Sequence, residues 1–444
     1  MELKYKKICV IGMGRSGIAA ANFLAGRGAT VTLTDQRSEE ELKDISPSLH
    51  QKIHAVYGDC APQDNAEMIV LSPGVDIHAD FLTAAQSRGT EILSEIELAS
   101  RFSTTPVIAV TGTNGKTTCT TLIGNILEKA EVKARTGGNI GTPFISFIDQ
   151  GPVDYLVIEV SSFQLEAVHQ FRPRVSVILN ITPDHLDRHS TLEHYMALKG
   201  RLAAQQTEED VLILNHDDPL AMEAGKGKRA KKVFFSTKKQ LECSVFLRSG
   251  VIVARFNEAE EIICRVDELK QPARWQLENI LASTAVAKCV NIGKENIADA
   301  LRDYSGMEHR MEWVRTIHGI DFINDSKGTN VGAVQKSLTT LTQPVILIAG
   351  GKDKAGEFEA LKKLFKAKVK HLVLIGETKQ KFRAILNGSF SYEDAENLED
   401  AVSRSFKKAQ AGDAVLLSPA CASFDMFDNY EDRGNRFKAI VYDL

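Results

Sequence analysis

Ile108-Ala-Val-Thr111 and the segment that follows it, Gly112-Thr-Asn-Gly-Lys-Thr-Thr118, decide the fold. The apolar run is typical of a buried strand, and the residues from Cys119 to Glu128 continue with helical spacing. A strand, a glycine-containing loop and a helix in this order form a phosphate-binding loop. The glycines let backbone amides converge on phosphate oxygens, and the helix N-terminus adds partial positive charge. The stretch therefore predicts a nucleotide site.

Two side chains of this loop have expected roles. Lys116 reaches the β- and γ-phosphates, and the Thr117 hydroxyl binds Mg²⁺. Val110 stands where the usual pattern has glycine, so the first half of the loop is shorter. A glycine-rich turn with an incidental lysine is the competing interpretation. The predicted nucleotide-binding residues of the loop are Gly112, Thr113, Asn114, Gly115, Lys116, Thr117 and Thr118.

Short apolar runs alternate with helix-period segments on both sides of this loop, which is typical of parallel sheets covered by helices. The predicted fold class is α/β with three domains, residues 1–103, 104–306 and 307–444. We expect Rossmann-like sheets in the first and third domains. The central domain should hold a P-loop ATPase-type parallel sheet, with a small β excursion over residues 242–267 that turns at Ser249-Gly250. The predicted strands are residues 8–12, 30–34, 68–71, 107–111, 155–160, 175–180, 211–215, 320–324, 345–350, 371–376 and 414–418.

Composition excludes several classes of protein. The 444 residues are 43% hydrophobic and carry a net charge of −4, which does not favour nucleic acid or acidic lipid as a partner. No apolar run reaches the roughly 18 residues of a membrane-spanning helix, and the start of the chain lacks the apolar segment of a signal peptide. Seven cysteines without a C-x-x-C pair indicate reduced thiols. We expect a cytoplasmic protein without membrane or nucleic-acid partners.

A second glycine pattern lies near the N-terminus. Gly12-Met-Gly-Arg-Ser-Gly17 is a complete G-x-G-x-x-G between a strand and a helix, and Asp35 ends the next strand. Taken alone the pattern indicates NAD, but a helix N-terminus binds any pyrophosphate, including that of a UDP-sugar. Ser72-Pro-Gly74 follows another strand and is expected at the same sheet edge, where it could close over a diphosphate. A tight turn without a ligand is the alternative.

Carboxylates and histidines follow two strands of the central domain. Glu159 ends one strand, and Pro183-Asp-His-Leu-Asp-Arg-His189 follows the next. Open α/β sheets place their sites at the carboxyl ends of strands, so both are candidates for binding Mg²⁺. His185 and His189 could also be a zinc pair without an evident third ligand, or His185 could serve only as a cap or hydrogen-bonding group. Lys199, taken by itself, is an ordinary surface lysine.

Together these motifs resemble the Mur ligase family of amide-forming synthetases, over essentially the whole chain. The resemblance implies an ATP-dependent ligase that adds D-glutamate to UDP-N-acetylmuramoyl-L-alanine, a peptidoglycan precursor, through an acyl phosphate. It implies a monomer whose partners are these small molecules. The strings that carry it are Gly112-Thr-Asn-Gly-Lys-Thr117, Gly138-Asn-Ile-Gly141, Glu159-Val-Ser-Ser-Phe-Gln-Leu165, Leu179-Asn-Ile-Thr-Pro-Asp-His-Leu-Asp-Arg-His189, Asn324-Asp-Ser-Lys-Gly-Thr-Asn330 and Leu417-Ser-Pro-Ala-Cys-Ala-Ser-Phe-Asp425.

The resemblance also assigns two Mg²⁺ ions. Thr117 and Glu159 match the ligands of the first ion, and His185 and Lys199 match those of the second. Lys199 matches a carbamoylated lysine, since a lysine binds a cation only after it acquires a negative group. The residues implied to be catalytic are Lys116, Glu159, His185, Lys199 and Lys327.

Substrate contacts follow from the same resemblance. Asn279, Arg310 and Asp325 match nucleotide contacts, and Lys327 matches a group that the third domain brings in. Tyr430 stands where a phenylalanine can occur, and its hydroxyl has no assigned role. The positions implied for the UDP-substrate are Gly14, Arg15, Ser16, Gly17, Asp35, Ser72, Pro73, Gly74, Asn139 and Ser161. Those implied for D-glutamate are Thr329, Lys354, Ser423, Phe424 and Tyr430.

Two other classes of protein are compatible with part of the sequence. An NAD-dependent oxidoreductase would use Gly12 to Gly17 but leaves the phosphate loop unexplained, and retention of NAD(H) without affinity for UDP-sugars would support it. A non-enzymatic ATP-binding switch would use Lys116 but has no need of Glu159 or Lys199. Phosphate release that depends on both substrates would exclude the switch.

Overall fold

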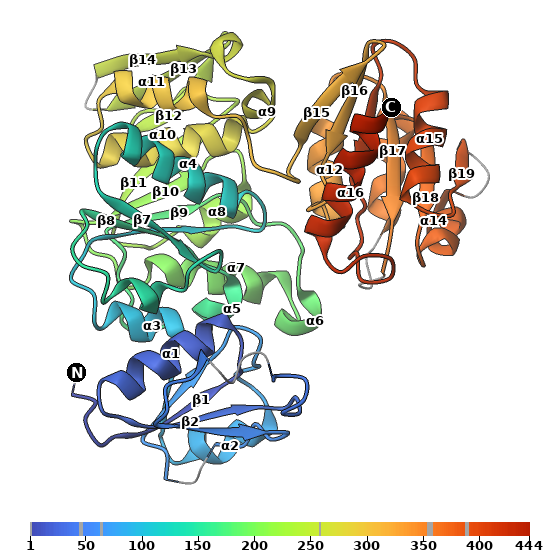
Figure 1. The fold of residues 1–444 in the computed structure, drawn as a ribbon. Helices are drawn as coiled ribbons and strands as arrows, with labels where there is room; N and C mark the ends of the chain where they lie inside the picture. The colour runs from blue at the N-terminus through green and yellow to red at the C-terminus, as the bar shows by residue number, and fades with distance from the viewer. Residues whose placement is uncertain (1, 44–47, 63–64, 257–258, 353–357, 387–389) are drawn as a thin grey trace. The chain divides into compact units, whose positions relative to one another are not determined.

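The chain folds as three open α/β sheets (Figure 1), which confirms the predicted fold class. The computed structural model describes residues 2–43, 48–62, 65–256, 259–352, 358–386 and 390–444. Packing divides the chain into two compact units. The first consists of Met1–Val266 and Glu278–Leu301, and the second of Asp267–Leu277 and Arg302–Leu444.

The N-terminal sheet has the strand order β3-β2-β1-β4-β5, and all of its pairings are parallel. Because β1 pairs with β2 on one side and β4 on the other, the strand order reverses there, and the loops after β1 and β4 border one crevice. The strands are β1 Lys7–Ile11, β2 Thr30–Asp35, β3 Ile53–Tyr57, β4 Met68–Leu71 and β5 Glu91–Ser94. The helices are α1 Arg15–Gly26, α2 Asp80–Ser87 and α3 Glu95–Ser100.

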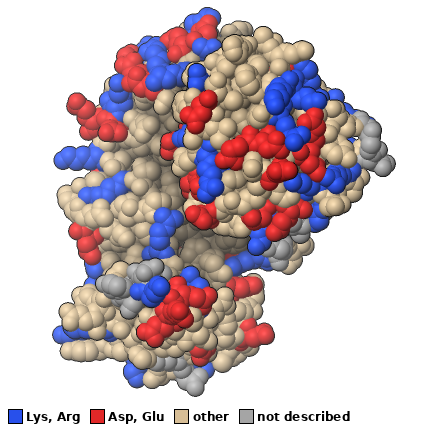
Figure 2. Space-filling model, turned by 45° about the vertical axis from the view of Figure 1, so that its right-hand side comes forward, with Lys and Arg blue, Asp and Glu red and all other residues tan. Residues whose placement is uncertain are grey.

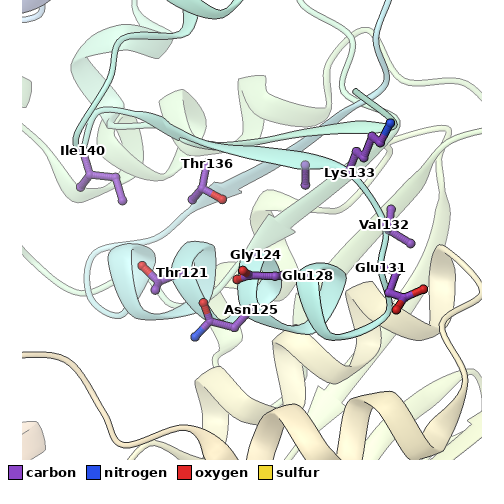
Figure 3. Close-up of a pocket in the computed structure, with 10 residues that line it drawn as sticks. Thr121, Gly124, Asn125, Glu128, Glu131, Val132, Lys133, Thr136 and Ile140 are labelled. Carbon is purple, nitrogen blue, oxygen red and sulfur yellow. The ribbon is translucent and has the colours of Figure 1, made fainter. Parts of the chain in front are cut away.

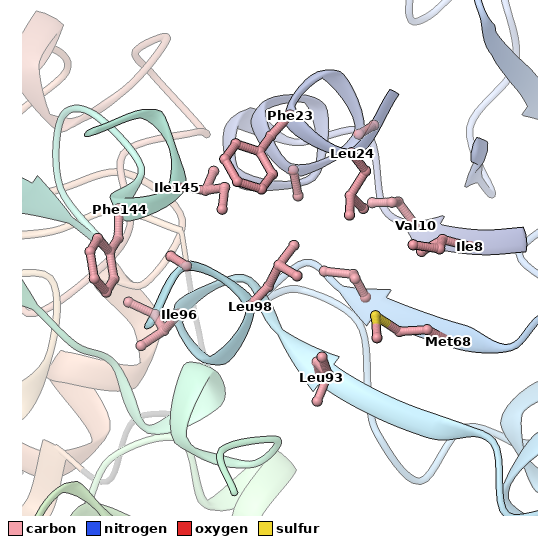
Figure 4. Packing of buried hydrophobic residues seen from close by; sticks show 14 of the residues in the cluster. Ile8, Val10, Phe23, Leu24, Met68, Leu93, Ile96, Leu98, Phe144 and Ile145 are labelled. Carbon is pink, nitrogen blue, oxygen red and sulfur yellow. The ribbon is translucent and has the colours of Figure 1, made fainter. Parts of the chain in front are cut away.

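One hydrophobic core runs from this sheet into the central domain (Figure 4). Ile8 and Val10 of β1 pack in the same cluster as Phe144 and Ile145, which belong to the short 3-10 helix η2, Phe144–Phe147. The buried carboxylate of Glu97 on α3 closes the junction by accepting the backbone N–H groups of residues 169–171 at 2.9–3.1 Å. The first two sheets therefore form one unit, and the boundary after residue 103 stays a prediction.

The central sheet has nine strands in the order β14-β13-β12-β11-β10-β9-β6-β8-β7. Strands β6 to β11 pair in parallel, and β12 is parallel to β11, whereas β13 is antiparallel to both of its neighbours, β12 and β14. The predicted excursion therefore extends the same sheet, and its turn has positive φ at Ser249 (48°) and Gly250 (77°), as in a type I′ hairpin. The strands are β6 Val107–Thr111, β7 Ala134–Gly138, β8 Tyr155–Glu159, β9 Val175–Ile178, β10 Val211–Asn215, β11 Lys231–Ser236, β12 Ser244–Arg248, β13 Val251–Phe256 and β14 Ala259–Arg265.

The order β9-β6-β8 positions the site of this domain. These neighbouring parallel strands end at the phosphate loop, at Glu159 and at the segment that follows Ile178, so the three lie at one edge. The helices of the domain are α4 Lys116–Lys129, α5 Ser162–Leu165, α6 Leu186–His189, α7 Leu192–Gly200, α8 Pro219–Ala224, α10 Leu277–Cys289 and α11 Lys294–Asp303.

The C-terminal sheet has the order β15-β16-β20-β17-β18-β19, and only the edge strand β15 is antiparallel. Because β20 lies between β16 and β17, the loops after residues 324, 350 and 417 lie at one edge. The strands are β15 Glu312–Ile317, β16 Ile320–Asn324, β17 Val345–Gly350, β18 Val369–Ile375, β19 Tyr392–Asp394 and β20 Ala414–Leu417. The helices of the second unit are α9 Gln271–Arg274, α12 Val331–Thr340, α13 Lys362–Lys368, α14 Lys379–Leu386, α15 Leu398–Lys408 and α16 Tyr430–Asp443.

Surface charge agrees with the balanced composition. Basic and acidic side chains are interspersed over the face shown in Figure 2. Within the described residues, no helix combines the length and apolar character needed to cross a membrane, and no two cysteines are joined by a disulfide.

Candidate active site

The phosphate loop has the backbone that its glycines predict. Gly112 and Gly115 have φ of +155° and +85°, conformations that L side chains rarely adopt. Gly115 caps α4, and Lys116 is the first residue of that helix. The Lys116 ammonium donates to the carbonyls of Gly112 (2.8 Å) and Thr113 (2.9 Å). The lysine therefore folds back over the loop, where it can reach a phosphate.

Two asparagines from other segments hold the loop. A Cβ atom at Gly115 would lie 2.3 Å from Asn279 Oδ1, so the predicted nucleotide residue Asn279 packs directly on the loop from α10. Asn180, which sequence reasoning did not single out, accepts from the Asn114 N–H at 2.8 Å and donates to the Asn114 carbonyl at 3.0 Å. Its position just after β9, beside the loop strand β6, is the signal that could have identified it.

Glu159 lies at the end of β8 with 2% of its surface exposed. Its Oε1 accepts from the side-chain amide of Asn139 at 2.9 Å, and its Oε2 is buried without a hydrogen-bond partner. A buried carboxylate oxygen without a donor fits a bound cation, because an unpaired charge at such a site is costly. The structure thus joins Asn139, predicted for the UDP-substrate, to the predicted metal ligand.

Lys199 on α7 is not the surface residue that it resembles when taken alone, because only 1% of it is exposed. Its Nζ donates to the Gly112 carbonyl at 2.9 Å and lies 4.4 Å from the centroid of the Tyr195 ring. Burial, and then the charge of Lys116, lower the pKa of Lys199 well below its ordinary value. Burial therefore disfavours the charged ammonium at this position. In the sequence, Tyr195 and Lys199 are one helical turn apart, and this spacing could have indicated that Lys199 packs beside the tyrosine.

The two histidines of the candidate zinc pair have different surroundings. His185 has a left-handed backbone (φ 52°) and a side chain that is 48% exposed, with its ring 4.9 Å from the ring of Phe163. His189 is buried, its Nε2 lies 3.0 Å from Ser162 Oγ, and burial lowers its pKa to about 4. Across the described part of the chain, no group of three histidine, cysteine or acidic residues could hold a metal ion. A zinc site has no support, whereas Mg²⁺ needs fewer protein ligands.

At the N-terminal switch point, the loops after β1 and β4 are in contact. Ser72 Oγ donates to the Gly12 carbonyl at 2.7 Å, and a Cβ at Gly17 would lie 1.9 Å from the same carbonyl oxygen. By contrast, a Cβ at Gly14 or Gly74 would meet no atom within 4 Å. Gly17 is thus needed for packing, while the backbone at Gly14 and Gly74 stays accessible to a ligand. Arg15 donates to the carbonyl of Gly141 at 3.3 Å.

Two predicted UDP-substrate residues have structural partners. Asp35 accepts from the Met13 N–H at 2.7 Å and from the Arg37 guanidinium at 2.9 Å. Burial alone would raise the pKa of Asp35, but the hydrogen bonds from Arg37 and Met13 lower it to about 2. Ser161 caps α5 and forms a capping box with Gln164. The side chains of Asp35 and Ser161 therefore stabilise the local backbone through these hydrogen bonds. Ser16 lies in the first turn of α1, directly after Gly14, and Pro73 lies in the loop that bears Ser72.

In the second unit, Asp325 follows β16 and is 6% exposed. It accepts from the hydroxyls of Ser337 (2.6 Å) and Ser418 (2.7 Å). Burial raises its pKa to about 6. A Cβ at Gly328 would lie 2.7 Å from Asp325 Oδ2 and 2.8 Å from Ser418 Oγ. The absence of a side chain at Gly328 therefore matters to this cluster.

Arg433 is a buried residue that sequence reasoning missed. No part of it is exposed, and it donates to the hydroxyl and carbonyl of Ser326 at 2.9 and 2.8 Å and to the Cys421 carbonyl at 3.3 Å. Burial lowers its pKa to about 10. It joins the loops after β16 and β20, and nothing in its local sequence signals this.

The residues predicted for D-glutamate lie at this edge where they are described. Ser423 is 2% exposed, Phe424 is 64% exposed, and Thr329 is half-buried. Tyr430 begins α16, and its hydroxyl accepts a hydrogen bond from the Lys327 ammonium. Lys354 lies outside the described residues. Arg310, Asp325 and Lys327 also belong to the second unit, whereas the phosphate loop belongs to the first.

A separate pocket of about 680 Å³ runs along α4 (Figure 3). Its lining includes Thr121, Asn125 and Glu128 from the helix and Thr136 from β7. None of the predicted site residues lines it, so this pocket is distinct from the phosphate loop.

The three sheets and the phosphate loop define the class of the chain, a multidomain α/β protein of the P-loop type. Three family models match it in order. They are the N-terminal domain of MurD-like Mur ligases over residues 6–94, the Mur ligase middle domain over residues 110–287, and the Mur ligase glutamate ligase domain over residues 309–421. The chain belongs to the Mur ligase family, which confirms the resemblance read from its motifs.

Similar proteins agree with this assignment. The UDP-N-acetylmuramoylalanine--D-glutamate ligase of Caldanaerobacter subterraneus subsp. tengcongensis is 43% identical over 100% of both chains. The enzyme of the same name from Pelotomaculum thermopropionicum is 44% identical over 99% of this chain and 98% of its own. A pseudomurein peptide ligase type C from Methanothermus fervidus shares the fold, with a TM-score of 0.63 at 20% identity over 99% of each chain.

Proposed function

We propose that the chain is an ATP-dependent ligase that joins D-glutamate to UDP-N-acetylmuramoyl-L-alanine in the synthesis of a peptidoglycan precursor. The observation that carries the proposal is the identity of 43% and 44% with two enzymes named for this reaction, over at least 98% of each chain. The phosphate loop supports it, because an amide cannot form from a carboxylate without activation.

The chemistry proceeds in two steps. The substrate carboxylate attacks the γ-phosphorus of ATP, which gives an acyl phosphate and ADP. The amine of D-glutamate then attacks the acyl carbon, loses a proton, and the tetrahedral intermediate expels inorganic phosphate. Lys116, folded over the phosphate loop, is suited to bind the β- and γ-phosphates, because its ammonium lies against the Gly112 and Thr113 carbonyls of that loop. Its positive charge offsets repulsion between the carboxylate and the triphosphate.

The residues present fit two Mg²⁺ ions. Thr117 and Glu159 would hold one, and the buried Glu159 Oε2 without a donor supports this assignment. His185 and Lys199 would hold the other, with Lys199 carbamoylated. When bound, the ions supply positive charge next to the phosphates. Carbon dioxide reacts with neutral amines, so the lowered pKa of the buried Lys199 supports the carbamate.

We assign the UDP end of the substrate to the N-terminal switch point. The contact between Ser72 and the Gly12 carbonyl and the open space over Gly14 and Gly74 support it, since a pyrophosphate binds close to exposed backbone amides. The residues assigned there are Gly14, Arg15, Ser16, Gly17, Asp35, Ser72, Pro73, Gly74, Asn139 and Ser161.

We assign D-glutamate to the C-terminal sheet, through Thr329, Lys354, Ser423, Phe424 and Tyr430. Asn279, Arg310 and Asp325 are assigned to the nucleotide, and Lys327 to the phosphoryl transfer. We further propose three domains, residues 1–103, 104–306 and 307–444, in a monomer that acts in the cytoplasm, where ATP and UDP-linked precursors are available. Lys327→Ala should lose most turnover, and normal turnover would refute its role.

Phosphate release tests the function directly. The wild-type protein is incubated with ATP, Mg²⁺ and UDP-N-acetylmuramoyl-L-alanine, and a panel of amino acids is supplied one at a time. We expect release only with D-glutamate and only when the UDP-substrate is present. A preference for L-alanine or a diamino acid would assign the chain to another reaction of the family.

A further inference from the structure

Arg188, on the short helix α6, reaches across to the N-terminal domain. Its Nη2 donates to the Val75 carbonyl at 2.6 Å, and its Nη1 lies 3.3 Å from the Gly74 carbonyl. Gly74 ends the Ser72–Gly74 loop, which lies at the switch point against the Gly12 carbonyl. A single guanidinium from the central domain therefore binds two consecutive carbonyls of this loop.

The guanidinium is held rigidly on its other side. Both Nε and Nη2 bond to the carboxylate of Glu166, and the Arg188 Cζ lies 4.7 Å from the centroid of the Phe163 ring. The side chains of Arg188 and Glu166 are 14% and 10% exposed. A charge-assisted pair of this kind, stacked on an aromatic ring, leaves the guanidinium few orientations.

We propose that Arg188 is the positioning residue that fixes the Ser72–Gly74 loop for the diphosphate of the UDP-linked substrate. This inference rests on the proposed function, which places the diphosphate at that loop. Arg188 lies on α6 three residues after His185, the N-cap of that helix, so one short segment bears both the candidate metal ligand and the support of the diphosphate loop. Binding at the two ends of the substrate thereby depends on one rigid segment.

Lysine cannot replace this arginine fully. A lysine ammonium can keep a charge beside Glu166, but it lacks the planar fork that reaches Glu166 and two carbonyls at once. Without the fork, the Gly74 and Val75 carbonyls lose their donor, and the loop loses the orientation in which Gly74 faces open space. The loss should act on the UDP-substrate and leave ATP binding, on α4, unchanged.

The test compares Arg188→Ala and Arg188→Lys with Arg201→Ala. Arg201 is a matched control, because it also donates from the central domain to backbone carbonyls, those of Glu166 (2.7 Å) and Leu165 (3.4 Å), and these bonds do not reach the described residues of the N-terminal domain. For Arg188→Ala we expect the KM for UDP-N-acetylmuramoyl-L-alanine to rise about tenfold or more, with the KM for ATP within about twofold. Arg188→Lys should be intermediate, and Arg201→Ala should match the wild type.

Calorimetric binding of UDP, without ATP or amino acid, separates this inference from the proposed function. Weaker binding of UDP by Arg188→Ala than by the wild type would support the inference, even if the amino-acid panel rejected D-glutamate. An equal rise of the KM values for all substrates would refute it, because a purely structural role would produce that result. Unchanged UDP affinity in a folded Arg188→Lys variant and unchanged KM for the UDP-substrate would also refute it.

Discussion

The ammonium of Lys327 donates a hydrogen bond to the hydroxyl of Tyr430 and lies 3.8 Å from the centroid of the same ring. Lys327 follows β16, and Tyr430 is the first residue of α16, so two elements far apart in sequence meet through this pair. The hydroxyl whose role the sequence left open thus has a partner among the predicted catalytic residues.

Tyr430→Phe should lower turnover about fivefold to tenfold, because Lys327 loses one of the groups that orient it while its contact with the ring is kept. The melting temperature should change little. Tyr442→Phe, on the same helix at a position that is 59% exposed, is the matched control and should behave as the wild type. Full turnover in Tyr430→Phe would show that the hydroxyl does not orient Lys327.

A carbamate on Lys199 should be visible in the protein without substrates. In buffer with ¹³C-labelled bicarbonate, we expect a carbamate signal by ¹³C NMR that Lys199→Gln abolishes. Lys228→Gln is the control, because burial also lowers the pKa of Lys228 but that residue is no candidate ligand. A signal that survives in Lys199→Gln, or that disappears in Lys228→Gln, would contradict the assignment.

Glu95 should make stability fall as pH rises. Burial raises its pKa from 4.5 to about 7, although the Ile145 N–H bonds to it at 2.6 Å. Between pH 4.5 and pH 7 the Glu95 carboxyl has lost its proton in the unfolded chain but keeps it in the folded chain. The folded state therefore binds more protons in this range. The contribution of Glu95 to stability is therefore greatest below pH 4.5, and about 3 kcal/mol of that contribution is lost by pH 7.

Glu95→Gln should flatten this dependence, since glutamine keeps an oxygen for the Ile145 N–H but does not ionise. The measurement is denaturant unfolding between pH 4.5 and pH 8. Glu128→Gln, at an exposed position on α4, should retain the wild-type slope. If the free energy of unfolding of Glu95→Gln keeps the wild-type slope with pH, the Glu95 carboxyl is not the source of this pH dependence.

Gly115→Ala should raise the KM for ATP at least about tenfold, because the new Cβ would displace the side chain of Asn279. Part of any stability loss will come from the positive φ itself, about 1–2 kcal/mol for an alanine. Gly151→Ala isolates that part, because Gly151 has a φ of +82° and nothing within 4 Å of its Cβ position. Equal KM values for ATP in the two variants would refute a steric role for Gly115.

The strands that sequence reasoning found are those with apolar runs buried on both faces, such as β6 and β17. It missed β7, whose sequence Ala-Arg-Thr-Gly-Gly has no apolar run, because β7 is an edge strand that is only partly buried. It also missed the edge strands β3, β5, β15 and β19, and the internal strand β11, which begins with two exposed lysines. A run or period of apolar residues in the sequence reveals a buried strand, whereas edge strands are less buried and show a weaker pattern.

The sequence by itself determined the order of the elements, the phosphate loop and the family, because these depend on local spacing and on motifs that are contiguous in the chain. Only the tertiary structure decided the environment of single groups. Lys199 is buried beside the Gly112 carbonyl with a lowered pKa, Arg188 donates to the Gly74 carbonyl, and Arg433 is buried between two loops. A pKa and a hydrogen bond depend on atoms brought together from distant segments, and local sequence does not contain those distances.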